Sequence, residues 1–472
     1  MRALRLAKPD AVTVARAAGA AVLLCAVGLA AALMAAGMPR DVSITAALVI
    51  FAVGFWAFGV LPDALTGLIF LVGAVMLTEA PAGTVFSGFA TSAFWLVFAG
   101  LTLSACVRHT GLAAWFGKTL AWRARGVGSY GTIVTLVVLF STSLALVLPA
   151  TFGRVALLVP LVGALAESLG HKPGSGGRTG LLLAAVIGTY VVPTTFLPAN
   201  LPNLILAGSL ESIYGVTPTF GAYLLLHFPV IGMIKGIALI GIITWLFREQ
   251  PKGASHDHAD QERPALSGGA RRLAVILLVT LILWATDAWH GGTAAWIGLT
   301  AAIICLLPIT RVMSFSDVPA ATIFPILLHL GAILGIGIIM AQSGAGTVLA
   351  APVIEALPLA EASDALRLAM LALVGVVASL AATMGGAPAI TAPLFGEFAA
   401  MTGWSVEAVG MSQVIGYATP LLPYQVPPLV VGIAMANVSL RDTTRVLVLL
   451  AAVTTPVVVP AAYFWWRFLG WI

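Results

Sequence analysis

The segment TFLPANLPNLILAG at residues 195–208 and the segment PLLPYQVPPLVVG at residues 420–432 share the pattern L-P-x-x-x-P-x-L, at a constant offset of 225 residues. Both lie in apolar surroundings. A proline inside a helix removes a backbone donor and clashes with the preceding turn, so each segment is expected to kink or, with two prolines, to unwind. Unwinding frees carbonyl groups for a cation and exposes the N-terminus of the following half-helix to an anion. The matched pair therefore predicts two broken helices around one binding site.

The composition indicates whether water or lipid surrounds the chain. It has 472 residues, of which 60% are hydrophobic and only 9% are charged. A soluble globular domain has about a quarter of its residues charged. Since so few polar side chains cannot cover a water-facing surface, the sequence predicts an all-α polytopic membrane protein. Its net charge of +5 does not indicate a nucleic-acid partner.

Apolar runs long enough to cross ~30 Å of hydrocarbon predict eleven spanning helices. They lie near residues 17–37, 43–60, 63–79, 92–107, 179–197, 220–247, 273–289, 293–308, 318–341, 405–421 and 444–468.

Two further apolar stretches are unlike single spans. One covers about residues 129–168 and is broken by Pro149 and Pro160; the other covers about residues 366–402 and is broken by TMGGAP (383–388) and Pro393. Irregular backbone at membrane depth is tolerated where protein or a water-filled cavity shields it. Each stretch is therefore predicted to be a re-entrant helical hairpin.

The basic residues support this layout. With the N-terminus inside, the cytoplasmic segments collect most of the 23 Lys and Arg residues, while Arg40, Arg367 and Arg467 lie opposite. This asymmetry holds only if both hairpins return to the side they left. The predicted location is a bacterial inner membrane, with the N-terminus cytoplasmic and the C-terminus periplasmic.

The two halves of the chain form a repeat. FWLVFAGLTLSACVRHTGLAAW (94–115) is similar to FPILLHLGAILGIGIIMAQSGAG (324–346), with Gly111 opposite Gly344. An odd number of spans separates the matching elements, so the repeats face opposite ways across the bilayer, as in many transporters. The predicted division is an N-terminal helix (1–42), a first inverted repeat (43–248), a cytoplasmic linker (249–272) and a second inverted repeat (273–472).

The chain resembles the divalent anion/sodium symporter family (the SLC13-like members of the ion transporter superfamily). The resemblance rests on LPNLIL (201–206), LPYQVPP (422–428), the segment from Arg108 to Leu112 and the two hairpins. It implies a secondary transporter of small organic anions such as di- or tricarboxylates, working by alternating access as a symporter or exchanger. It also implies a homodimer in the lipid bilayer.

The hairpin tips depart from that family. The family typically has Ser-Asn-Thr at both tips, where it helps to hold sodium and substrate carboxylates. The corresponding residues here are Ala150-Thr151-Phe152 and Thr383-Met384-Gly385. Sodium coupling therefore does not carry over, and either sodium or a proton remains open as coupling ion.

Polar and small residues at the tips and breaks are the candidate binding residues. The set for substrate or ion is Thr151, Arg154, Thr194, Thr195, Asn200, Asn203, Thr383, Gly385, Gly386, Thr419, Tyr424 and Gln425. A sodium ion, if one binds, is expected near Thr151, Asn200, Thr383 and Gln425. Arg154 is a charge at membrane depth, which suggests function; the hypothesis is that it replaces a sodium ion and pairs with the substrate, and the alternative is that it reaches the interface.

Other functions are less compatible with the sequence. It contains no Walker A loop, HExxH or GxSxG motif, which argues against ATP coupling within the chain and against an enzyme with those motifs. Few acidic residues fall inside spans, which disfavours a cation/proton antiporter. A sulfonate, sulfate or other oxyanion permease stays open as an alternative, and no cofactor is expected.

Overall fold

A computed structural model describes residues 11–124, 129–148, 150–250 and 265–472. In these residues the chain is helical and contains no strand. The first half contains α1 (Ala11–Ala35), α2 (Arg40–Phe58), α3 (Asp63–Leu77), α4 (Ala82–Val85), α5 (Ser92–His109), α6 (Leu112–Ala124), α7 (Tyr130–Val147), α8 (Thr151–Ser168), α9 (Gly176–Gly188), α10 (Leu201–Tyr214), α11 (Phe220–His227) and α12 (Met233–Leu246). The second half contains α13 (Gly268–Ala285), α14 (Asp287–His290), α15 (Ala294–Leu306), α16 (Ala320–Ser343), α17 (Ala345–Ala356), α18 (Asp364–Thr391), α19 (Phe395–Thr402), α20 (Val406–Tyr417), α21 (Pro427–Ala436) and α22 (Leu440–Phe468).

The membrane-protein prediction is confirmed. Ten helical segments of the described residues are long and apolar enough to cross a bilayer, and shorter apolar helices accompany them. A helix forms at each of the eleven predicted spans. Two boundaries differ from the sequence-based division: α2 already begins at Arg40, and α13 begins at Gly268, inside the predicted linker. Most of that linker (251–264) lies outside the described residues.

Both predicted hairpins form. In the first, α7 ends at Val147 and α8 begins at Thr151. The predicted break at Pro160 is wrong, because α8 continues through this residue. Pro149, the other predicted break, lies outside the described residues. In the second, the backbone of α18 leaves the helical region at Ala382 and Thr383, and the returning arm passes through the 3₁₀ turn Ala392–Leu394 into α19. The predicted break at Pro393 therefore lies inside the returning arm.

Both proline-containing segments break their helices. After α9 the chain forms the 3₁₀ turns Pro193–Thr195 and Leu197–Ala199 and then restarts as α10. After α20 it forms the turn Pro423–Gln425 and restarts as α21. Because the same order recurs around both hairpins, the two halves are inverted repeats of one unit.

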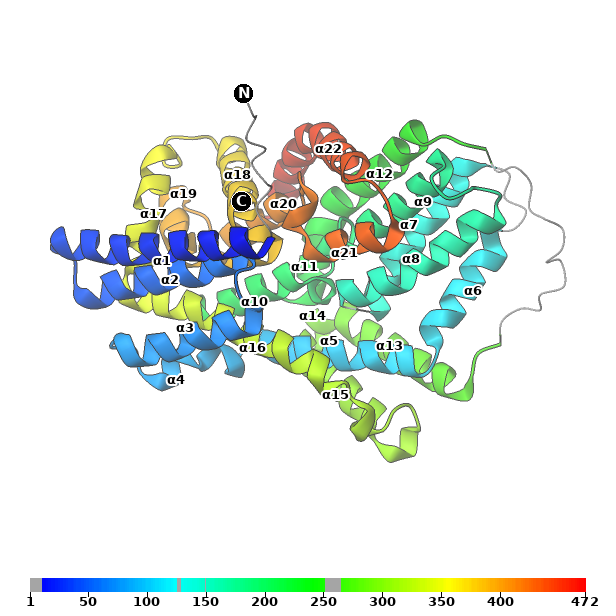
Figure 1. The fold of residues 1–472 in the computed structure, drawn as a ribbon, viewed down its shortest axis with the longest axis horizontal. Helices are drawn as coiled ribbons and strands as arrows, with labels where there is room; N and C mark the ends of the chain where they lie inside the picture. Colours follow the sequence, from blue (N-terminus) through cyan, green and yellow to red (C-terminus); the bar gives the residue numbers. More distant parts are fainter. Residues whose placement is uncertain (1–10, 125–128, 149, 251–264) are drawn as a thin grey trace, which may run out of the picture.

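The turns before the short helices also match between the repeats. Gly111 separates α5 from α6, and Gly344 separates α16 from α17; their φ angles are 75° and 78°. Glycine adopts this left-handed conformation without the penalty that a Cβ brings. In Figure 1, α17–α19 and α6–α9, which follow these turns, lie at opposite ends of the molecule.

The helices form two groups. α2, α3, α5, α15 and α16 pack on one another, whereas the hairpins pack on the broken helices, α8 on α9 and α21, and α18 on α20 and α10. α10 also contacts α5 and α16, so the first broken helix borders both groups. The candidate site lies along this border.

Candidate functional site

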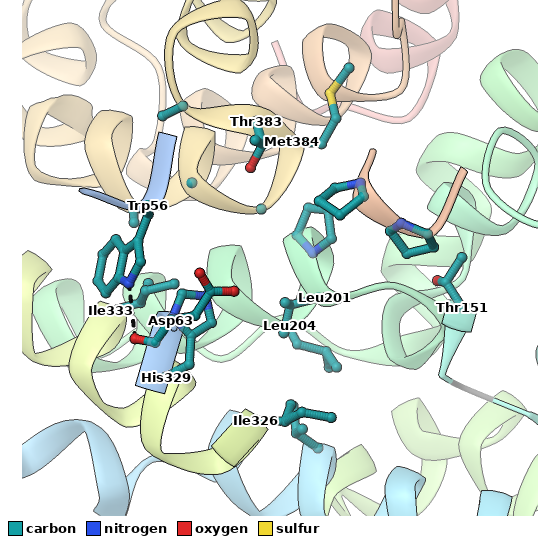
Figure 2. A pocket seen from close by; sticks show the side chains of 18 of the residues that line it. Trp56, Asp63, Thr151, Leu201, Leu204, Ile326, His329, Ile333, Thr383 and Met384 are labelled. Carbon is teal, nitrogen blue, oxygen red and sulfur yellow. Dashed lines mark hydrogen bonds between the residues drawn. The ribbon is translucent and has the colours of Figure 1, made fainter. Parts of the chain in front are cut away.

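A cavity of about 490 Å³ lies where the hairpin tips and the broken helices meet the other group of helices. Thr151 at the first tip and Thr383, Gly385 and Gly386 at the second line it, as does Gln425 at the second break. Figure 2 shows Thr151 and Thr383 reaching the cavity from different sides, with Ile326, His329 and Ile333 on α16 forming another wall. Two segments more than two hundred residues apart in the chain thus contribute to one site.

Arg154 does not line this cavity. It is fully buried behind the first tip, on α8. Its Nη1 donates to the carbonyl oxygens of Leu148 (2.6 Å) and Ala199 (2.9 Å). Its Nη2 donates to the carbonyl oxygen of Thr189 (2.8 Å). The guanidinium therefore joins the first hairpin tip to both sides of the first helix break.

Two predicted site residues complete this cluster. Arg154 Nη2 donates to Thr151 Oγ1 at 3.0 Å and to Asn200 Oδ1 at 2.8 Å. Thr151 Oγ1 in turn donates to Asn200 Oδ1 at 2.8 Å. Carbonyl, hydroxyl and amide oxygens are the ligands that a hard cation prefers. Here the guanidinium of Arg154 already binds these oxygen atoms. The cluster around Thr151 and Asn200 therefore has the ligands of a cation site, and Arg154 occupies it.

At the second tip, none of the described residues that line the cavity is Lys or Arg. Thr383 has φ 63° and ψ 169°, a conformation that is rare for any residue with a Cβ. The residue three positions further on, which corresponds to Arg154 in the first tip, is Gly386. The second tip is therefore open to the cavity where the first tip is filled.

Gln425 lies at the position of the second break that corresponds to Asn200 in the first. Its Oε1 accepts hydrogen bonds from the backbone N–H groups of Leu421 (2.7 Å) and Leu422 (2.8 Å). This fixes the orientation of the amide. Its Nε2 is buried and has no hydrogen-bond partner among the described residues.

Lys235 is buried in α12 and contacts the second broken helix. Its Nζ donates to the carbonyl oxygen of Ala418 and to Thr419 Oγ1, each at 2.7 Å. The carbonyl groups at the end of a helix carry partial negative charge, so an ammonium group stabilises the C-terminal end of α20. Thr419 is therefore paired here and does not line the cavity.

The remaining predicted residues make local hydrogen bonds away from the cavity. Thr194 and Thr195 donate to carbonyl oxygens three residues earlier, and Asn203 Nδ2 donates to the carbonyl oxygen of Phe196. Tyr424 is half exposed, and its hydroxyl donates to the carbonyl oxygen of Leu380. These contacts hold the broken helices in shape, and none of the four residues lines the cavity.

The predicted site set lacks four polar residues of the cavity wall. Asp63 begins α3, and Trp56 lies near the end of α2. His329 lies on α16, and Tyr190 follows the end of α9. Trp56 Nε1 donates to the backbone carbonyl of Asp63 at 3.0 Å, and the rings of Trp56 and His329 meet edge to face at 4.9 Å. The signal for Asp63 was its place directly after a proline at a predicted helix start, where an acidic residue is usually a helix-terminus feature.

Comparison with known proteins agrees with this architecture. The family model described as "sodium:sulfate symporter transmembrane region" matches residues 15–472. A protein named "membrane protein" from Cupriavidus necator is 23% identical over 407 residues, covering 84% of this chain and 78% of that protein. The L-tartrate/succinate antiporter of Escherichia coli K12 is 25% identical over 250 residues, covering 49% of this chain and 48% of the antiporter. The chain thus aligns with about half the length of that antiporter.

Two solved transporter structures share the fold. The YdaH transporter of Alcanivorax borkumensis superposes with a TM-score of 0.56 at 17% identity, covering 92% of this chain and 99% of that one. MtrF of Neisseria gonorrhoeae superposes with a TM-score of 0.55 at 13% identity, covering 84% of each chain. The relatives and neighbours with a stated activity are transporters and not enzymes. With a family model that covers nearly all of its length, this chain belongs to the divalent anion/sodium symporter family of secondary transporters.

Proposed function

We propose that the protein carries small organic anions across the membrane by exchange, and that di- and tricarboxylates are the class to test first. The hydrogen bonding of Arg154 carries this proposal. A carrier that moves a cation with its substrate needs an oxygen site that the cation can enter and leave. The oxygen atoms at the first tip and first break are bonded to a guanidinium that belongs to the chain. A covalently attached cation cannot be released, so it cannot couple transport to a cation gradient.

The position of Arg154 also gives it a role in the transport cycle. It connects the first tip to the broken helix through at least three carbonyl groups. Its fixed positive charge lies behind Thr151, which lines the cavity. We propose that this charge favours an anion in the cavity through space and keeps the tip and the break together as one moving unit. Arg154 is therefore a positioning residue in this proposal.

Alternating access follows from the two groups of helices. The hairpins and broken helices would move as a unit against the group formed by α2, α3, α5, α15 and α16, carrying the anion at their shared border. The N-terminus is proposed to lie in the cytoplasm and the C-terminus in the periplasm of a bacterial inner membrane. The support is the distribution of basic residues. A homodimer is proposed from the family resemblance.

Uptake of labelled succinate into proteoliposomes tests this function. Vesicles are either preloaded with unlabelled succinate or empty, each with and without an inward sodium gradient. We expect uptake into preloaded vesicles that is indifferent to sodium, and little uptake into empty ones. Sodium-driven uptake into empty vesicles would contradict exchange. Such uptake would require a sodium site that Arg154 does not occupy.

A further inference from the structure

The polar groups of the cavity are unequally distributed between its two hairpin tips. At the first tip, Thr151, Asn200 and Arg154 satisfy one another. At the second tip, Thr383 and two glycines line the cavity, and the position that corresponds to Arg154 is Gly386. Of the two tips, the second therefore keeps more hydrogen-bonding capacity for a ligand.

The side-chain group that is available near the second tip is a hydrogen-bond donor, the amino group of Gln425 at the second break. Gln425 is fully buried among the residues that line the cavity, and its Oε1 accepts the backbone N–H groups of Leu421 and Leu422. Its Nε2 has no partner in the described part of the chain. A buried donor without an acceptor is costly, whereas a carboxylate or sulfonate oxygen placed there would satisfy it. A cation at this position would meet an N–H donor and not an oxygen ligand.

The backbone beside Gln425 supports the same chemistry. The helix restarts after Thr383, and the first N–H groups of a helical segment have no acceptor within it. The next residues that line the cavity are Met384, Gly385 and Gly386. If Gly385 carried a Cβ, the nearest atom to it would be Leu201 Cδ2, at a distance of 3.9 Å. The space over this backbone is therefore free for a ligand. An anionic oxygen can approach the main chain there.

Most of the remaining side chains that line the cavity are apolar. Leu204 on α10 and Ile326 and Ile333 on α16 point into it (Figure 2), and Leu96 of α5 also lines it. None of the described residues that line it is Lys or Arg, and its carboxylate, that of Asp63, would repel a second carboxylate of a ligand. Ligand pockets of 300–1,000 Å³ hold drug-sized molecules, so about 490 Å³ exceeds the needs of a compact diacid.

We infer that the preferred substrate is an amphipathic organic anion, with one anionic end and an apolar, ring-sized body. The anionic end is bound by Gln425 Nε2 and the backbone of Thr383–Gly386, and the body lies against Leu204, Ile326 and Ile333. This inference rests on the proposed transport of small organic anions, and within that class it favours an anion with an apolar body over the di- and tricarboxylates. The driving force for the apolar end is its removal from water.

A matched pair of ligands tests the inference. 3-Phenylpropionate is succinate with one carboxylate replaced by a phenyl ring. Both are titrated by calorimetry against the full-length protein in lipid nanodiscs, with empty nanodiscs as the blank for partition into lipid. We expect 3-phenylpropionate to bind at least tenfold more tightly than succinate.

A pair of variants locates the effect. Ile326→Ala shortens a side chain of the apolar wall and should weaken 3-phenylpropionate binding about fivefold while leaving succinate binding unchanged. Phe324→Ala, two residues away on α16, changes an exposed side chain that does not line the cavity and should alter neither affinity. Thermal unfolding of both variants shows whether they are folded.

The outcomes separate this inference from the proposed function. Succinate binding as tightly as 3-phenylpropionate, or more tightly, would overturn the inference and leave anion exchange standing. A tenfold preference that Ile326→Ala does not reduce would also overturn it, because the ring would then bind elsewhere. Absence of binding by either anion, together with absence of succinate exchange, would overturn both.

Discussion

Lys235 Nζ lies 2.7 Å from Thr419 Oγ1 and donates a hydrogen bond to it, which ties α12 to the break that follows α20. The same ammonium group donates to the carbonyl oxygen of Ala418. In the first repeat, Arg154 similarly binds the carbonyl oxygen of Thr189, at the end of α9. Each broken helix thus has a buried cation at the C-terminal end of its first half, where the helix dipole favours positive charge.

Replacement of Lys235 by Met should lower the free energy of unfolding by about 1–3 kcal/mol, because it leaves a buried carbonyl group without its donor. A double-mutant cycle with Thr419→Val, followed by unfolding in detergent, measures how much of this loss is the hydrogen bond between the two side chains. Residues in contact typically couple by about 0.5–3 kcal/mol. Strictly additive effects of the two substitutions would show that the bond contributes nothing.

Replacement of Arg154 by Gln should remove exchange and also lower stability by about 3 kcal/mol or more, since several buried acceptors lose a charged donor at once. Arg154→Lys keeps the charge but cannot reach all of these acceptors in the planar geometry of a guanidinium. We therefore expect Arg154→Lys to restore part of the stability and little of the exchange, measured by thermal unfolding and counterflow. Full exchange by Arg154→Gln would contradict the role proposed for the guanidinium.

The conformation of Thr383 predicts a substitution that stabilises the fold. Its φ of 63° with ψ 169° is a region that glycine occupies readily and that costs other residues about 1–3 kcal/mol. Thr383→Gly should raise the unfolding temperature. Thr391→Gly, in the helical part of α18, is the matched control and should lower it, because glycine costs about 1 kcal/mol inside a helix. If both changes lower the unfolding temperature, the second tip is not strained.

Replacement of Gln425 by Glu separates binding from folding. The carboxylate can still accept from the N–H groups of Leu421 and Leu422, so the break should keep its shape. The amino donor is lost and a negative charge is added, so anion binding should weaken at least tenfold. Tyr424→Phe, at the preceding position, is the control. It removes the hydrogen bond to the carbonyl oxygen of Leu380, which lies outside the cavity. Unchanged affinity in Gln425→Glu, measured by calorimetry, would exclude Gln425 from the site.

The crossing of α18 and α20 depends on the absence of two side chains. A Cβ at Gly416 would lie 2.6 Å from the carbonyl oxygen of Ala372 and 2.7 Å from the Cα of Gly375. Small residues allow membrane helices to approach this closely. Gly416→Ala should therefore lower the unfolding temperature by several degrees, whereas Gly241→Ala, which has open space around it, should not. An equal effect of the two substitutions would show that the crossing can widen without cost.

Much of the architecture could be predicted from the sequence because its causes are local. Residues 129–168 and 366–402 were recognised as hairpins, since their prolines and glycines interrupt apolar runs at places where a single span would be continuous. The breaks at Pro198 and Pro423 followed from the loss of backbone donors. The tip residues Thr151 and Thr383 followed from their spacing to these features, and both line the cavity.

The direction of each side chain could not be predicted in the same way. Arg154 lies only three residues beyond Thr151, yet it points to the carbonyl groups behind the tip and not into the cavity. Asp63 belongs to a helix start between two predicted spans, and only the packing of α2 and α3 against α16 brings it beside His329 at the cavity.

The sequence by itself determined the membrane environment, the spans, the hairpins and the paired helix breaks, because hydrocarbon and proline act on each segment separately. The tertiary structure alone decided which polar groups satisfy one another and which remain available to a ligand. That outcome depends on the rotation and register of helices from both repeats, which are set by packing between segments far apart in the chain. For this reason Thr151 and Asn200 are bonded to Arg154, while Gln425, at the equivalent break, keeps an unpaired donor.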